Sequence, residues 1–163
     1  MSLFSPTSTP SVITNNDPNA VELGFKFTSS QAGQITGIEF YKGPQNTGTH
    51  VADLWSATGT LLATATFTGE TASGWQQVNF ATPVPITAGT TYVASYHTNV
   101  GEYSATANQF ANAVTSGPLT APSSSSSGGN GVYSYGSSSL FPTSAYNATS
   151  YGVDVLFKPQ LVG

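Results

Sequence analysis

Charged side chains are scarce in this sequence, and arginine and cysteine are absent. Only 6% of its residues are charged, against roughly 25% in an ordinary soluble domain. The three basic residues are all lysines and the net charge is −4, so the sequence lacks the clustered positive charge that binds nucleic acid or an anionic membrane surface. Composition therefore argues against both partners. The absence of cysteine is neutral, because a domain of this length folds without disulfides.

Long apolar runs and helical periodicity are also missing. No segment approaches the roughly 18 consecutive apolar residues of a membrane-spanning helix. Met1–Phe4 lack the basic flank and apolar core of a signal peptide. We interpret residues 1–163 as a single domain, with Met1 placed on a piece cut from a longer secreted protein. A surface rich in hydroxyls and amides rather than charges suits an extracellular location.

Several segments alternate between apolar and polar residues, as strands with one buried face do. In Val21–Phe27, four apolar residues share one face, and Glu22 and Lys26 share the other. The pattern recurs at 61–68 and 152–157, and weaker strands are expected at about 34–41, 50–56, 75–80, 91–98 and 131–136. Turn signals rich in glycine separate these segments. The sequence predicts an all-β fold, an antiparallel two-sheet β-sandwich of jelly-roll-like form.

The stretch from 99 to 130 carries few strand signals and ends in the serine run 123–127. We expect it to be a long loop within the same domain, because strand-like sequence resumes at Val132. Loops of this length inside compact domains are often functional. A short helix is predicted at about 105–114, where Phe110 and Val114 are four residues apart. Residues 159–163 are expected to form a tail.

Nothing in the sequence marks a catalytic site. The two histidines, His50 and His97, lie in no motif that pairs a nucleophile with a base. Seven acidic residues could supply a carboxylate pair for glycoside hydrolysis, but no spacing singles one out. We therefore expect a protein that is not an enzyme.

Oxygen-bearing side chains suggest calcium as a candidate metal. Asp17 follows two asparagines in a turn, Glu22 begins the first long strand, and Asp154 lies on the last strand. If the first and last strands are neighbours, these carboxylates could meet and supply the oxygen ligands that calcium prefers. The alternative is that Asp17 caps a turn and Asp154 faces solvent. No other cofactor is indicated.

Aromatic residues give the strongest functional signal. If Val78 and Phe80 point inward, alternation places Trp75, Gln77 and Asn79 together on the outer face. An indole beside two amides suits a sugar, because the ring stacks on the apolar face of a pyranose and the amides bond its hydroxyls. Tyrosines gather in the second half, and Tyr103, Tyr133 and Tyr135 are further candidates for glycan contact. The alternative is that these aromatic rings belong to the core.

A resemblance extends along nearly the whole chain. It rests on Ala20-Val21-Glu22-Leu23-Gly24, Gly37-Ile38-Glu39-Phe40-Tyr41-Lys42-Gly43, Asn46-Thr47-Gly48-Thr49-His50, Leu54-Trp55-Ser56, Thr91-Tyr92-Val93-Ala94-Ser95-Tyr96, Gly117-Pro118-Leu119-Thr120-Ala121-Pro122 and Val153-Asp154-Val155. With these segments the chain resembles an uncharacterised domain family of secreted bacterial proteins. The resemblance implies a module within a multidomain chain, monomeric in itself, and no assigned activity.

Together, these observations predict a non-catalytic accessory module of a secreted bacterial protein that binds polysaccharide or glycan. The alternative is a structural spacer or adhesin-stalk domain without a ligand. A glycan binder needs an exposed aromatic row or cleft, whereas a spacer needs only a hydroxylated surface.

Overall fold

The computed structural model describes residues 1–160, and its regular secondary structure is almost wholly β-strand. They are β1 (Val21–Ser29), β2 (Gly33–Lys42), β3 (His50–Ser56), β4 (Leu61–Thr66), β5 (Gly74–Ile86), β6 (Tyr92–Thr98), β7 (Val114–Ser116), β8 (Leu119–Ala121), β9 (Val132–Tyr135) and β10 (Val153–Pro159). The helical turns are η1 (Gln109–Ala111), a 3₁₀ turn, and α1 (Ser124–Ser127). Within residues 1–160, no helix has the length and apolar character needed to cross a membrane. The all-β prediction is confirmed.

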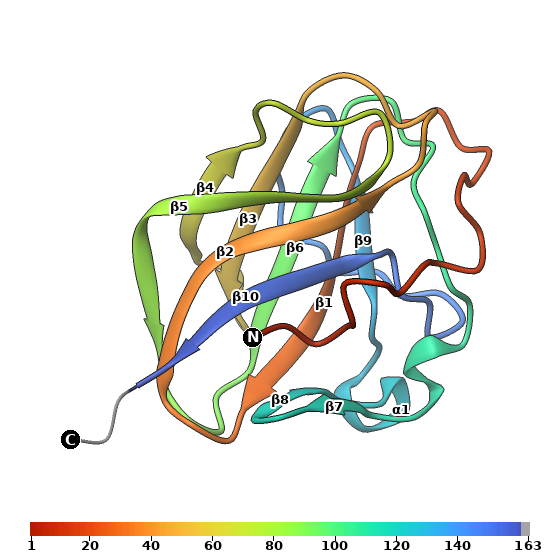
Figure 1. Cartoon of the computed structure of the whole chain (residues 1–163). Coiled ribbons are helices and arrows are strands. Elements are labelled where there is room, and N and C mark those ends of the chain that lie inside the picture. Colours follow the sequence, from red (N-terminus) through yellow and green to blue (C-terminus); the bar gives the residue numbers. More distant parts are fainter. Residues whose placement is uncertain (161–163) are drawn as a thin grey trace.

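Two antiparallel sheets pack face to face (Figure 1). The large sheet has the order β4-β3-β6-β1-β8-β7, with β9 also paired to β1, and the small sheet has the order β10-β2-β5. The chain repeatedly changes sheets, because β1 lies in the large sheet, β2 in the small one and β3 in the large one again. This architecture confirms the predicted two-sheet β-sandwich with jelly-roll-like strand exchange.

The core between the sheets is rich in aromatic rings. The four apolar residues predicted on the inner face of β1 are at most 2% exposed. Phe40 of β2 stacks on Tyr96 of β6 with ring centroids 4.2 Å apart, and both side chains are fully buried. Each such side chain contributes about 1.5–3 kcal/mol when removed from water. Burial on this scale explains how the domain folds without disulfides.

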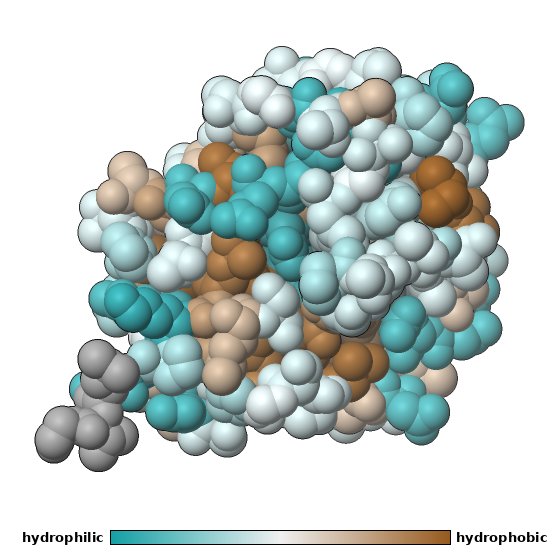
Figure 2. Space-filling view, in the orientation of Figure 1, coloured by the Kyte–Doolittle hydropathy of each residue, from teal (hydrophilic) through white to brown (hydrophobic). Residues whose placement is uncertain are grey.

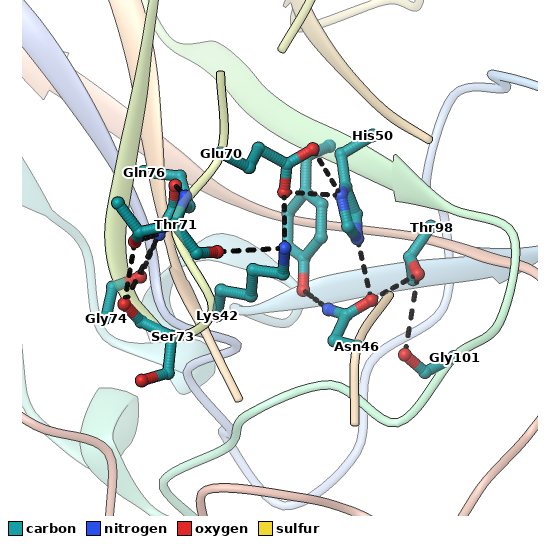
Figure 3. A network of polar contacts seen from close by, with 11 residues as sticks. Lys42, Asn46, His50, Glu70, Thr71, Ser73, Gly74, Gln76, Thr98 and Gly101 are labelled. Carbon is teal, nitrogen blue, oxygen red and sulfur yellow. Dashed lines mark hydrogen bonds and ion pairs between the residues drawn. The ribbon is translucent and has the colours of Figure 1, made fainter. Parts of the chain in front are cut away.

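A polar network fills the region where β2 ends and β3 begins (Figure 3). His50 is fully buried, with its Nδ1 atom 2.8 Å from Glu70 Oε1 and its Nε2 atom 2.7 Å from Asn46 Oδ1. Lys42 Nζ lies 3.2 Å from the same Glu70 oxygen, and Thr98 donates to Asn46 Oδ1. Burial lowers the pKa of His50 even though Glu70 opposes this shift. The network ties the loop before β3 to β6.

Part of the outer face of the large sheet is covered, which the simple alternation pattern does not show. Glu22 is fully buried and Trp55 is 7% exposed, because the segment from Gly136 to Pro142 lies over them. The Phe141 ring meets Trp55 edge-on at 5.6 Å. With Val93 and Val132, Trp55 forms a small apolar cluster separate from the main core. Trp55 therefore packs outside the core between the two sheets.

The stretch from 99 to 130 is more ordered than its sequence suggests. It contains η1, the β7–β8 hairpin and α1. The helix predicted at 105–114 shrinks to η1, where Phe110 turns into the core. The serine run instead forms α1, and the Ser123 hydroxyl caps it by accepting from the Ser126 N–H. Short polar side chains favour such caps.

The first residues run beside β10 (Figure 1). The Met1 amino group donates to the Phe157 carbonyl, and the Phe157 N–H donates to the Met1 carbonyl, both at 2.8 Å. The Asp154 carboxylate accepts from the N–H groups of Leu3 and Phe4, at 2.8 and 2.7 Å. Burial raises the pKa of Asp154 to about 6, although these hydrogen bonds oppose it. Asp154 therefore anchors the N-terminal segment, and it does not face solvent.

Candidate functional site

Three segments that are distant in the sequence meet beside the sandwich. A bridge pairs Val12 with Ala105, and another pairs Thr106 with Ser150. The Asn15 N–H also donates to the Tyr103 carbonyl at 2.8 Å. Backbone hydrogen bonds thus align the segments around residues 12–17, 103–107 and 146–151, and side chains from all three converge.

These segments enclose a cleft of about 260 Å³, which we call the tyrosine cleft. Its polar and aromatic walls come from Asn15, Tyr103, Tyr146, Asn147, Thr149 and Tyr151, and Val12 and two alanines complete the lining. None of these lining residues carries a charge. The cleft therefore offers aromatic rings, amides and hydroxyls to a ligand, without an ion-pair partner.

Tyrosine rings form a connected row behind and beside the cleft. Tyr103 meets Tyr151 edge-on at 5.5 Å, Tyr151 meets Tyr133 at 6.2 Å, and Tyr133 meets Tyr135 at 5.8 Å. Such edge-to-face pairs stabilise one another beyond their buried area. The row thus runs from the buried rings of Tyr103 and Tyr151 to Tyr135, which is 50% exposed. Tyr146 lies outside the row on the wall of the cleft and is 64% exposed.

Asp17 fixes the edge of this row. Its Oδ2 atom accepts from the hydroxyls of Tyr135 and Tyr103, and its Oδ1 atom accepts from the backbone N–H and side-chain amide of Asn19. Burial alone would raise the pKa of Asp17, but the hydrogen bonds from Tyr135 and Asn19 outweigh it and lower this pKa. An ionised Asp17 holds two of the tyrosines that the sequence singled out.

The structure does not bring the three candidate calcium ligands together. Asp17 bonds to tyrosines, Glu22 lies on the outer face of the large sheet beside Ser95, and Asp154 binds backbone N–H groups next to the small sheet. Within residues 1–160, no group of three His, Cys, Asp or Glu side chains is placed to hold a metal ion.

Trp75, Gln77 and Asn79 lie on the outer face of β5, as alternation predicts. Gln77 and Asn79 are exposed, but Trp75 is half-buried. Its indole N–H donates to the Ser8 carbonyl at 3.0 Å, and its ring meets Tyr41 edge-on at 5.6 Å. The adjoining cavity measures about 30 Å³, the room of a single water molecule. Trp75 holds the N-terminal segment, and the wider tyrosine cleft is the better candidate site.

Sequence reasoning therefore selected Tyr103, Tyr133 and Tyr135 and missed the rest of the cleft. Tyr146, Asn147, Thr149 and Tyr151 lie in a segment with no strand pattern, and Asn15 was considered only as a metal ligand. In the structure, Asn147 and Ala148 at the side of the cleft adopt left-handed φ angles of 52° and 47°. Consecutive residues of this kind form a tight turn of type I′.

This turn carries strain at Ala148, which leads to a prediction. The left-handed conformation costs a residue with a Cβ roughly 1–2 kcal/mol, whereas glycine adopts it freely. We expect Ala148→Gly to raise the free energy of unfolding by about 0.5–1 kcal/mol in urea titrations. Ala145→Gly is the control, since Ala145 has no positive φ, and it should lower stability slightly. Equal effects of the two changes would contradict strain at the turn.

The fold and the cleft define a β-sandwich domain with an uncharged, aromatic surface cleft. A family model described as "Domain of unknown function (DUF4082)" matches residues 7–153. The chain belongs to this family, which confirms the predicted membership of an uncharacterised domain family. No curated protein matches the chain.

Proposed function

We propose that this domain is a non-catalytic module that binds a neutral polysaccharide or glycan in the tyrosine cleft. The observation that carries the proposal is the lining, which combines three tyrosine rings with amides and a hydroxyl and contains no charged residue. Tyrosine presents an apolar face to the C–H groups of a sugar and a hydroxyl to its oxygens. Ligand clefts commonly combine apolar walls with a few polar groups that fix orientation.

The surface supports an extracellular setting for this activity. The face seen in Figure 2 is dominated by pale residues of intermediate hydropathy, with strongly hydrophilic and apolar residues in separate patches. Hydroxyl and amide side chains keep such a surface hydrated although it carries few charges. A secreted accessory module that contacts a neutral polysaccharide does not need ion pairs to bind it.

A spacer or stalk domain is the second candidate. Its main support is the same hydroxylated surface, which any stable secreted module could share. The tyrosine cleft distinguishes the two, because a spacer has no use for an accessible Tyr146 or for a strained turn at its side. Strain of this kind is often found at functional sites.

Tyr146 provides the direct test. Its side chain is 64% exposed, so Tyr146→Ala should change the free energy of unfolding by no more than about 0.5 kcal/mol. Binding to a glycan selected on an array of neutral polysaccharides should weaken tenfold or more, or about 1.4 kcal/mol. Asn147→Gly removes an amide from the cleft and keeps the left-handed turn, so it should weaken binding without unfolding the domain.

Leu62→Ala is the matched control, because Leu62 is exposed on β4 and lies outside the cleft. It should leave glycan affinity unchanged. If no neutral glycan binds the wild-type domain, or if Tyr146→Ala binds as tightly as wild type, the spacer becomes the better account.

A further inference from the structure

Glu22 and Asp53 form a buried carboxyl pair on the outer face of the large sheet. Both side chains are 0% exposed. Glu22 Oε2 accepts from the Ser95 hydroxyl at 2.6 Å, and that hydroxyl accepts from the Trp55 indole N–H at 2.8 Å. Glu22 Oε1 and both oxygens of Asp53 are buried with no donor within hydrogen-bond distance among residues 1–160. Two bare carboxylates side by side in an apolar setting would be very unfavourable.

Among residues 1–160, no lysine or ion pair offsets the charge of the two carboxyls. His97 lies directly opposite Glu22 on β6, and its Nε2 atom contacts the Gly136 carbonyl at 2.8 Å. Lys26, further along the same face of β1, donates to the Ser127 carbonyl. The covering segment 136–142 contains no ionisable side chain. A proton shared by the two carboxyls is the simplest way to reduce the charge, since two adjacent carboxyls seldom both ionise.

The pKa of Glu22 agrees with this geometry. Burial first, and then a hydrogen bond and repulsion from Asp53, raise the pKa of Glu22 to about 10. The folded protein therefore keeps a proton that the unfolded chain loses above its ordinary pKa of 4.5. The stabilisation contributed by Glu22 is complete below its unfolded pKa of 4.5 and is lost as the pH rises through its pKa in the folded protein, about 10. Between these two pKa values, each pH unit lowers the folding equilibrium constant by up to tenfold.

The segment from Gly136 to Pro142, which we call the cover, closes over the pair. It is held by the His97 contact to Gly136 and by the Phe141 ring against Trp55, and the Leu140 backbone lies beside the Glu22 carboxyl. The cover begins directly after Tyr135 at the end of β9. Beyond it, Ser144 pairs with Tyr133 through two backbone hydrogen bonds, so both ends of the cover are held by β9.

We propose that a proton shared between Glu22 and Asp53 latches the cover onto the large sheet, and that loss of this proton at alkaline pH releases the cover from Trp55. The latch stands on its own geometry and is independent of the proposed function. Release follows because a second negative charge in this dry site is relieved only by admitting water.

Trp55 reports directly on the cover. In a Trp75→Phe background, Trp55 is the remaining tryptophan, and its quenching by acrylamide is measured from pH 6 to 10.5 without any glycan. We expect the quenching constant to rise several-fold along a single-proton curve. Adding Glu22→Gln should keep it at its pH 6 value throughout, because the amide is neutral at every pH.

Amide hydrogen exchange in residues 136–142, corrected for the intrinsic pH effect, gives a second readout on the otherwise unaltered chain. Asp53→Asn should also keep the cover closed, because its amide can donate to an ionised Glu22. The proposal would be overturned if acrylamide quenching in the Trp75→Phe protein did not change with pH, or if Glu22→Gln showed the same rise. It would also be overturned if millimolar calcium suppressed the rise, because a cation would then hold the carboxyl pair. Failure of the domain to bind glycan leaves these measurements unaffected.

Discussion

Gly101→Ala is expected to lower the free energy of unfolding by at least about 3 kcal/mol. Gly101 has a left-handed φ of 63°, and a Cβ built on it would lie 1.9 Å from the Asp17 carbonyl oxygen and 2.7 Å from that of Asn19. Both are backbone atoms, so the clash cannot be relieved by a side-chain rotation. The backbone that would have to move carries Asp17, and with it the hydrogen bond to Tyr135.

Gly69→Ala separates the clash from the cost of the backbone conformation. Gly69 has nearly the same φ, 62°, and open space around the corresponding Cβ position. This control should cost about 1 kcal/mol. Urea titrations of both variants give the difference, and equal losses would show that the contact between Gly101 and the Asp17 turn is not tight.

Asn130→Ala is expected to cost about 3 kcal/mol, because it leaves three backbone groups without partners. The Asn130 side chain accepts from the Lys26 N–H at 2.8 Å and donates to the carbonyls of Lys26 and Pro122 at 3.1 and 3.0 Å. It thereby joins β1 to the segment that carries α1. Thermal unfolding followed by circular dichroism would measure the loss.

Two further variants show whether Asn130→Ala destabilises the domain through the lost hydrogen bonds or through the smaller side chain. Asn130→Asp has nearly the same shape but replaces the two donated hydrogen bonds with repulsion between oxygens, so we expect a loss at least as large as that of alanine. Asn112→Ala alters an exposed asparagine and should change stability by no more than about 0.5 kcal/mol. A stable Asn130→Asp protein would contradict the assignment of the amide donors.

Local patterns predicted the strands well because alternation is a property of neighbouring residues. Val21, Leu23, Phe25 and Phe27 face the core as expected. The same pattern placed Glu22 on the opposite face correctly, yet could not show that this face is covered. The cover lies more than a hundred residues away in the sequence, and no local rule links the two.

The candidate site was only partly predictable for the same reason. Tyr103, Tyr133 and Tyr135 were selected by residue type, but their meeting at Asp17 depends on loops aligned by isolated bridges. Trp75 was expected to be an open platform, because strand alternation takes no account of a segment that crosses the sheet. The N-terminal residues do so and accept the indole N–H through Ser8.

The hydrogen-bonded pair of Met1 and Phe157 has a mechanical consequence. Because these residues lie side by side, any neighbours attached before Met1 and after Pro159 would join the domain along one edge of the small sheet. Tension between such neighbours would peel β10 away from one end, breaking a few hydrogen bonds at a time, and would not shear whole sheets at once.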